Sequence, residues 1–326
     1  MPRRLDVALP DWVADAIARN AATHDGKVLR QSAAALSASY RAKGRVEPGA
    51  VDPWAYVATR APATYAAIMS ALSALVDAAP DFAPRSLLDA GAGPGTASWA
   101  AFAAYPGITQ ATLIEASPPM RAAGMALASG APPALANATW SLADLRNAAI
   151  PQSDLGLAAY LMNELEIGAA TETVRHLFAA AQVLVLVEPG SRAGFERLRA
   201  ARAALVADGA ALVAPCTHAL ACPIASDDWC HFSVRVPRSR LHRQIKSAQL
   251  AYEDEKFSYL IAAKPALAAS IKRPHARIIR HPVARSGHVH LDLCADGAIS
   301  RHTATRRDGA WRTARKAAWG DGWNSD

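Results

Sequence analysis

Apolar and polar positions follow three successive patterns along the chain. Up to about residue 78, apolar residues recur at a spacing near 3.6, as in PDWVADAIARNAATH and KVLRQSAAALSASYRA. This spacing predicts amphipathic helices. The same pattern continues through AYVATRAPATYAAIMSALSALVDA and ends at a proline-containing loop. We therefore expect an N-terminal helical region over residues 1–78.

Beyond that loop, short apolar segments alternate with segments of helical composition. The strand candidates are residues 86–90, 111–116, 155–162 and 182–189, and pieces such as TETVRHLFAAA lie between them. Short apolar strands that alternate with helices predict a parallel sheet covered on both faces. We therefore expect a doubly wound α/β domain over residues 79–270.

The last segment, residues 271–326, has period-two stretches separated by glycine-containing turns. Asp-Gly pairs stand at 296–297 and 308–309. This pattern predicts a small β-rich meander or barrel.

Positive charge is concentrated in this last segment. From Lys272 to Lys316 there are eleven Lys or Arg and three Asp, a net charge of +8, whereas the whole chain carries +7. A basic end on an otherwise neutral protein indicates an anionic macromolecular partner. A solvated surface is the alternative.

Composition limits the location of the protein. The 326-residue chain is 52% hydrophobic, with much alanine, but no run of eighteen apolar residues occurs, so we expect no membrane span. The N-terminal MPRRLDVALPDW lacks the apolar core of a secretory signal and the longer Arg- and Ser-rich lead of a mitochondrial presequence. We expect a bacterial cytoplasmic monomer.

A glycine loop follows the first predicted strand in SLLDAGAGPGTASWA. Asp89 precedes Gly91, Gly93 and Gly95, which are spaced G-x-G-x-G. Dinucleotide-binding loops have G-x-G-x-x-G, but the position that would hold their third glycine is Thr96. The loop resembles motif I of the class I S-adenosylmethionine-dependent methyltransferases. The resemblance implies that it holds the amino acid end of that cofactor.

Acidic and amide side chains follow later strands of the same domain. Glu115 closes the second strand, where its carboxylate can accept both ribose hydroxyls of the cofactor. The resemblance places Asp144 against the adenine ring. Asn163 follows the fourth strand, at the rim where an acceptor would meet the methyl group, and completes the predicted cofactor-binding set.

The sequence identifies no catalytic base. Methyltransferases that act on nucleic acid amino groups place Asn or Asp, two prolines and an aromatic residue after the fourth strand. Here that position holds the four residues Asn-Glu-Leu-Glu from Asn163 to Glu166. Asn163 and Glu164 either orient an acceptor or serve as a helix cap and a solvated carboxylate. Methyl transfer therefore stays open.

Three of the four cysteines lie close together in residues 213–233. Cys216, Cys222 and Cys230 are spaced C-x5-C-x7-C, and Cys294 is the fourth. Clustered cysteines in a reducing compartment are more often metal ligands than disulfides. Four thiolates suit a tetrahedral zinc ion or a four-iron cluster, and the long gaps favour the wider cluster. Buried thiols without a metal are a third reading.

Six segments together resemble one family. SLLDAGAGPGTASWAA, LVLVEPGSRAGF, VAPCTHALACP, WCHFS, YEDEKFSYL and RKAAWGDGW, between residues 50 and 322, resemble the methyltransferase-like assembly factors of the mitochondrial small ribosomal subunit and their bacterial relatives. This resemblance implies a Rossmann-like class I methyltransferase domain with N-terminal helices, a cysteine-rich insertion and an OB-like C-terminal extension. It also implies S-adenosylmethionine, small-subunit rRNA as partner, and a 4Fe-4S cluster on Cys216, Cys222, Cys230 and Cys294, with zinc as the alternative metal.

Three functions are compatible with this resemblance. The first is an assembly factor that binds the cofactor and methylates rRNA. The second is a non-catalytic iron–sulfur module that binds rRNA on a methyltransferase fold. The third is a methyltransferase with another substrate.

Overall fold

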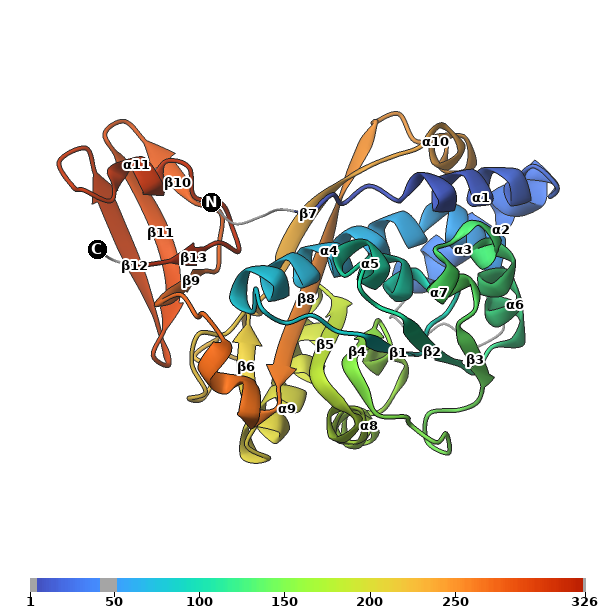
Figure 1. The fold of residues 1–326 in the computed structure, drawn as a ribbon. Coiled ribbons are helices and arrows are strands. Elements are labelled where there is room, and N and C mark those ends of the chain that lie inside the picture. The colour runs from blue at the N-terminus through green and yellow to red at the C-terminus, as the bar shows by residue number, and fades with distance from the viewer. Residues whose placement is uncertain (1–4, 42–51, 325–326) are drawn as a thin grey trace.

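The computed structural model describes residues 5–41 and 52–324, which form two β-sheets and their covering helices (Figure 1). The strands of the larger sheet are β1 (Ser86–Ala90), β2 (Gln110–Glu115), β3 (Thr139–Leu142), β4 (Ser153–Ala159), β5 (Ala181–Pro189), β6 (Ala211–Ala214), β7 (Phe232–Pro237) and β8 (Tyr252–Ala263). Their order is β3-β2-β1-β4-β5-β8-β6, and β7 pairs with β8. The protein therefore has the predicted Rossmann-like class I methyltransferase fold.

The larger sheet is mixed, so the prediction of a parallel sheet is only partly correct. Strands β1 to β5 run parallel, but β8 is antiparallel to β5, β6 and β7. Strand β8 pairs antiparallel with the preceding strand β7, and α10 lies in the connection between them. Only the second half of β8, Phe257–Ala263, is fully buried. Its first half extends beyond β5 and pairs with β7.

Helices cover both faces of this sheet. One face packs on α4 (Ala61–Ala78) and α5 (Thr96–Ala104), and the other packs on α8 (Ile167–Ala180) and α9 (Arg192–Ala207). The remaining helical segments are α1 (Asp11–Ala21), α2 (Gly26–Arg41), α3 (Pro53–Thr59), α6 (Pro118–Leu127), η1 (Ala128–Gly130), α7 (Pro133–Ala136), η2 (Met162–Glu164), α10 (Arg240–Lys246), η3 (Pro265–Ser270) and α11 (Trp311–Ala314).

Helix α4 is the one described helix that is long and apolar enough to cross a membrane. Its mean hydropathy is 1.2. In the fold it lies against β5, β6, β7 and β8, and side chains such as Tyr65, Ile68 and Leu72 are almost completely buried. Its apolar surface is therefore explained by core packing.

The C-terminal sheet is antiparallel throughout, as its period-two pattern predicted. Its strands are β9 (Ala276–Ile278), β10 (Val283–Arg285), β11 (His288–Ala295), β12 (Ala298–Thr305) and β13 (Gly322–Trp323). The β11–β12 turn places Asp296 and Gly297 at φ 47° and 77°, which suits an Asp-Gly pair. The OB-like character of this extension stays a prediction.

The strand predicted over residues 155–162 extends too far at its C-terminal end. Strand β4 stops at Ala159, Tyr160 adopts a left-handed φ of 60°, and the chain then enters η2. Apolar residues continue past Ala159, so the hydrophobic pattern could not mark this turn. The short strand β3 was also not predicted.

Candidate cofactor and four-cysteine sites

The glycine loop connects β1 to α5 and requires glycine. Gly91, Gly93 and Gly95 have φ values of 68°, 54° and 90°, where L side chains are strained. A Cβ atom added at Gly93 would meet nothing within 4 Å, whereas one added at Gly91 would lie 2.8 Å from Leu161 Cδ1. The loop is therefore open at Gly93 and packed at Gly91.

Asp89 lies buried at the end of β1, directly before this loop. Its Oδ2 atom accepts hydrogen bonds from Ser98 N at 2.9 Å and from Ser98 Oγ at 2.7 Å. Burial raises the pKa of Asp89 to about 6. Its Oδ1 atom is also buried and has no hydrogen-bond partner among the described residues. A cationic amino group would satisfy this oxygen, which fits the predicted amino acid end of the cofactor.

The structure brings Glu115 to the same loop. Its Oε2 atom accepts the Gly93 N–H at 2.7 Å, and its Oε1 atom accepts the Ser117 N–H at 2.7 Å. Burial raises the pKa of Glu115. Each carboxylate oxygen keeps a second lone-pair site, so two ribose hydroxyls can still donate to it.

Asp144 and Asn163 occupy different surroundings. Asp144 is half-exposed and forms a bidentate ion pair with Arg146, in which Arg146 Nε lies 3.0 Å from Asp144 Oδ1. Hydrogen bonding from Arg146 lowers the pKa of Asp144 to about 2. An adenine contact at Asp144 would therefore compete with this ion pair. Asn163 lies in η2, beside the end of β4.

Glu188 is a candidate site residue that the sequence reasoning missed. It is completely buried near the end of β5, and its Oε1 atom accepts the Met162 N–H at 2.8 Å. Burial raises the pKa of Glu188 to about 8. Its carboxyl group thereby holds η2, which carries Asn163, in place. A glutamate that ends an apolar strand was the available signal, as for Glu115.

Substituting Glu188 by glutamine should change the pH dependence of stability. The folded pKa of about 8 lies above the ordinary value of 4.5, so the folded protein holds a proton that the unfolded chain has lost between these values. The free energy of unfolding of the wild type should therefore fall as pH rises from about 4.5 to about 8, by up to about 1.4 kcal/mol per pH unit. In Glu188→Gln, the free energy of unfolding, measured with urea at pH 6 and pH 8, should fall less between these two pH values than in the wild type. An identical decline in both proteins would contradict the assignment.

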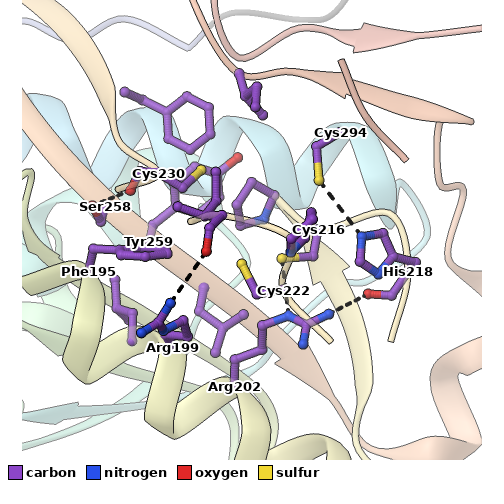
Figure 2. A pocket seen from close by; sticks show the side chains of 17 residues that line it. Phe195, Arg199, Arg202, Cys216, His218, Cys222, Cys230, Ser258, Tyr259 and Cys294 are labelled. Atoms are coloured by element: carbon purple, nitrogen blue, oxygen red, sulfur yellow. Dashed lines mark hydrogen bonds between the residues drawn. The ribbon is translucent and has the colours of Figure 1, made fainter. Parts of the chain in front are cut away.

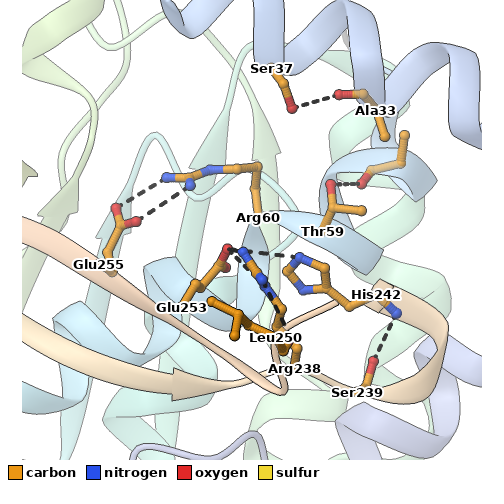
Figure 3. Close-up of polar contacts among 11 residues, drawn as sticks. Ala33, Ser37, Thr59, Arg60, Arg238, Ser239, His242, Leu250, Glu253 and Glu255 are labelled. Carbon is orange, nitrogen blue, oxygen red and sulfur yellow. Dashed lines mark hydrogen bonds and ion pairs between the residues drawn. The ribbon is translucent and has the colours of Figure 1, made fainter. Parts of the chain in front are cut away.

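A second missed group links the rim of the sheet to the N-terminal helices. The Tyr160 hydroxyl donates to Glu255 Oε1 at 3.0 Å, and Arg60 Nη2 lies 3.1 Å from the same atom. Figure 3 shows the Arg60–Glu255 pair beside a neighbouring pair, Arg238 and Glu253, which are 2.9 Å apart. Tyr160 follows β4 directly, so this network fixes the residue next to η2.

All four cysteines line one cavity between the two sheets (Figure 2). Cys216, Cys222 and Cys230 lie in the connection from β6 to β7, and Cys294 lies on β11 of the C-terminal sheet. The cavity has a volume of about 50 Å³. One water needs only about 10–15 Å³ on this measure, so the cavity has room for a larger group.

The thiols influence one another electrostatically. Burial and the neighbouring thiols raise the pKa of Cys294 to about 12, and the same causes raise the pKa of Cys230. The ring atom His218 Nε2 lies 3.7 Å from Cys294 Sγ, and Arg202 Nε lies 3.3 Å from Cys216 Sγ. Four thiolates in this space would repel one another unless a cationic group lay between them.

The four thiols line the cavity without converging on one point. Within residues 5–41 and 52–324, no three His, Cys, Asp or Glu side chains converge closely enough to hold one metal ion. The thiols instead surround a space. A zinc ion would require the sulfurs to move together to zinc–sulfur distances of about 2.3 Å.

Over most of its length, the sequence is similar to a family named for the mitochondrial small ribosomal subunit. Residues 50–324 match the family described as mitochondrial small ribosomal subunit Rsm22. The human ribosome assembly protein METTL17, mitochondrial, is 29% identical over 286 residues, covering 82% of this chain and 61% of the human protein. The Rsm22-cox11 tandem protein 2, mitochondrial, of Schizosaccharomyces pombe is 26% identical over 324 residues, covering 82% of this chain and 42% of that protein. The chain thus spans less than two thirds of both relatives.

Solved methyltransferase structures are more distant. The magnesium protoporphyrin IX methyltransferase of Synechocystis with bound SAH is 14% identical, has a TM-score of 0.42, and covers 74% of this chain and 100% of that one. A protein described as a putative RNA methyltransferase of Pyrococcus horikoshii is 11% identical, with a TM-score of 0.42, covering 61% and 82%.

The predicted bacterial cytoplasmic location is wrong. The matched family is named for the mitochondrial small ribosomal subunit, and both relatives are mitochondrial proteins. The N-terminal residues on which that prediction depended include 1–4, which lie outside the described residues.

Proposed function

Because the chain belongs to the mitochondrial small ribosomal subunit Rsm22 family, we propose that it is a small-subunit assembly factor that binds S-adenosylmethionine and rRNA. The observation that carries this proposal is the extent of the family match. Residues 50–324 include the glycine loop, all four cysteines and the basic C-terminal sheet. The matched region therefore contains both candidate sites and the charged extension.

The cofactor site is formed by the glycine loop and the two carboxylates beside it. Gly93 offers open space, Asp89 has a buried oxygen without a partner, and Glu115 retains two lone-pair sites. These features support binding of the amino acid end and the ribose, and we assign Asp144 and Asn163 to the same cofactor. When bound, S-adenosylmethionine supplies an activated methyl group.

Gly93→Val should weaken S-adenosylmethionine binding by at least about tenfold, equivalent to about 1.4 kcal/mol. The valine side chain would occupy the open space and strain a residue at φ 54°. Isothermal titration measures the affinity. Gly209→Val is a matched control, because Gly209 also has a positive φ and open space but lies in the α9–β6 turn. Equal affinity in Gly93→Val and wild type would refute this cofactor assignment.

The four-cysteine site is proposed to hold a 4Fe-4S cluster, with zinc as the alternative. Thiols from both sheets line one cavity, and they surround it without converging on a point. This arrangement supports an extended inorganic group. Cys216, Cys222, Cys230 and Cys294 would be its ligands, and the group would join the C-terminal sheet to the methyltransferase-like domain.

The rRNA partner is supported by exposed positive charge on the C-terminal sheet and its helix. The exposed basic side chains in this region that form no ion pair with a described residue include Arg285, Arg306, Arg307, Arg312 and Lys316. Arg301 instead forms a bidentate pair with Asp292. Arginine and lysine side chains that are free of carboxylates can contact phosphates.

A non-catalytic module is the second candidate function. Tyr160 and Glu255, which lie at the rim of the sheet, are hydrogen-bonded to each other, and Arg60 pairs with the same carboxylate. A general base must be available to accept a proton, and these groups are already occupied. Mass analysis of small-subunit rRNA from cells lacking the protein distinguishes the two functions. A missing methyl group would support the enzyme, and unchanged modification would support the module.

A further inference from the structure

Two buried arginines beside the four-cysteine site lack a carboxylate partner. Arg202 on α9 is 6% exposed, and Arg277 on β9 is 9% exposed. Neither forms an ion pair with any residue that the structure describes. A buried guanidinium without an anion is costly, so a negative charge is expected nearby.

Most of their hydrogen bonds go to residues 215–220 of the cysteine segment. Arg202 Nε donates to Cys216 Sγ at 3.3 Å, and its Nη2 atom donates to the carbonyl oxygens of His218 and Leu220 at 2.8 and 2.7 Å. Arg277 Nε donates to the carbonyl oxygen of Pro215 at 2.9 Å, and its Nη1 atom donates to the carbonyl oxygen of Gly320 at 2.9 Å. Apart from the sulfur, every one of these acceptors is a neutral carbonyl.

Two other arginines close to the same cysteines are different. Arg199 lines the cavity but lies 2.6 Å from Glu196, and Arg280 pairs with Asp228. Their side chains are also more exposed, at 34% and 28%. Among these four arginines, only Arg202 and Arg277 have no carboxylate partner in the described part of the chain. Both lie next to the residue pair Pro215-Cys216.

We propose that Arg202 and Arg277 are the counter-charges of the four-cysteine site, and that Arg202 also holds Cys216 through an N–H···S bond. Four thiolates around a group of charge +2, either a zinc ion or an oxidised four-iron core, leave a net charge of −2. Two guanidiniums balance it. This inference rests on the proposed metal site. It identifies two residues that control how tightly the metal group is held and, for an iron–sulfur cluster, its reduction potential.

The test compares Arg202→Met, Arg277→Met and Arg202→Lys with Arg199→Met as control, all in the full chain purified without oxygen. Transfer of iron to a chelator should be roughly 10–100-fold faster in the two methionine variants. Arg202→Lys keeps the charge but lacks the fork of donors, so its rate should be intermediate. Arg199→Met should resemble wild type. The reduction midpoint of the methionine variants should be more negative, because a positive charge near the cluster favours the reduced form.

Stability measurements separate this role from a merely structural one. Removing an uncompensated cation should cost less stability in the metal-free protein than in the loaded one, whereas loss of packing would cost the same in both. Should the wild type bind metal and both methionine variants release it at the wild-type rate, the counter-charge inference is overturned and the metal site stands. If the purified wild type contains no metal, both the counter-charge inference and the metal site are overturned. If the metal is zinc, which has no reduction midpoint to measure, the rate of release to the chelator is the deciding measurement.

Discussion

Cys294→Ser is expected to remove most of the iron from the protein and to loosen the C-terminal sheet. Cys294 is the one thiol in the cavity that comes from this sheet, so its loss breaks the connection between β11 and the segment holding Cys216 to Cys230. Because metal binding energy at such a site is also folding energy, protease should cut the variant faster after about residue 270. Iron analysis and limited proteolysis after anaerobic purification measure both effects.

The packing around the cavity explains the size of this effect. A small apolar cluster of Phe195, Ile224 and Ile279 joins the two sheets, and Cys294 packs against it. Trp319 also packs against Phe232 of the larger domain, so the metal site would add to an existing apolar link between the two parts. Chelator-treated wild type is the control and should show the same cleavage pattern. A variant that keeps its iron, or loses it without faster cleavage, would contradict the proposed link.

Exposed arginines of the C-terminal sheet should determine the salt dependence of rRNA binding. Combined Arg306→Gln, Arg307→Gln and Arg312→Gln should weaken binding to a small-subunit rRNA fragment. Each lost phosphate contact should reduce the slope of log affinity against log salt by about 0.7 to 0.9. Binding titrations at several salt concentrations give this slope for the variant and the wild type.

Arg301→Gln is the matched control for this experiment. Arg301 carries the same charge on the same sheet, but Asp292 holds its guanidinium at 2.7 and 3.1 Å. Arg301→Gln should therefore change the salt slope by less than one third of the change seen in the triple variant. Salt-insensitive binding by the wild type, or equal slopes in wild type and triple variant, would argue against an RNA-binding role of this surface.

The sequence was most informative where structure is local. The glycine loop, the strand before it and Glu115 were predictable because turn geometry and strand ends are encoded within a few residues. Strand β8 was not identified, because its place between β5 and β6 depends on distant partners. The end of β4 at Ala159 was missed for a similar reason: buried Glu188, 26 residues beyond Met162, holds the following turn.

The cysteine site shows the same limit. Spacing identified three neighbouring thiols, but only the family resemblance connected Cys294 to them, and the structure brings all four to one cavity. Arg202 lies in a helix with three other arginines, at positions 192, 197 and 199, so its sequence context looks like that of a solvated residue. Only its burial distinguishes it.

If the protein acts in assembly of the small ribosomal subunit, cells that lack it should have an altered profile of ribosomal subunits. Sedimentation of ribosomal particles from these cells should show fewer mature small subunits and an accumulation of incomplete ones, and the wild-type protein should restore the profile. Unchanged amounts of mature small subunits, with no incomplete particles, would contradict the proposed function.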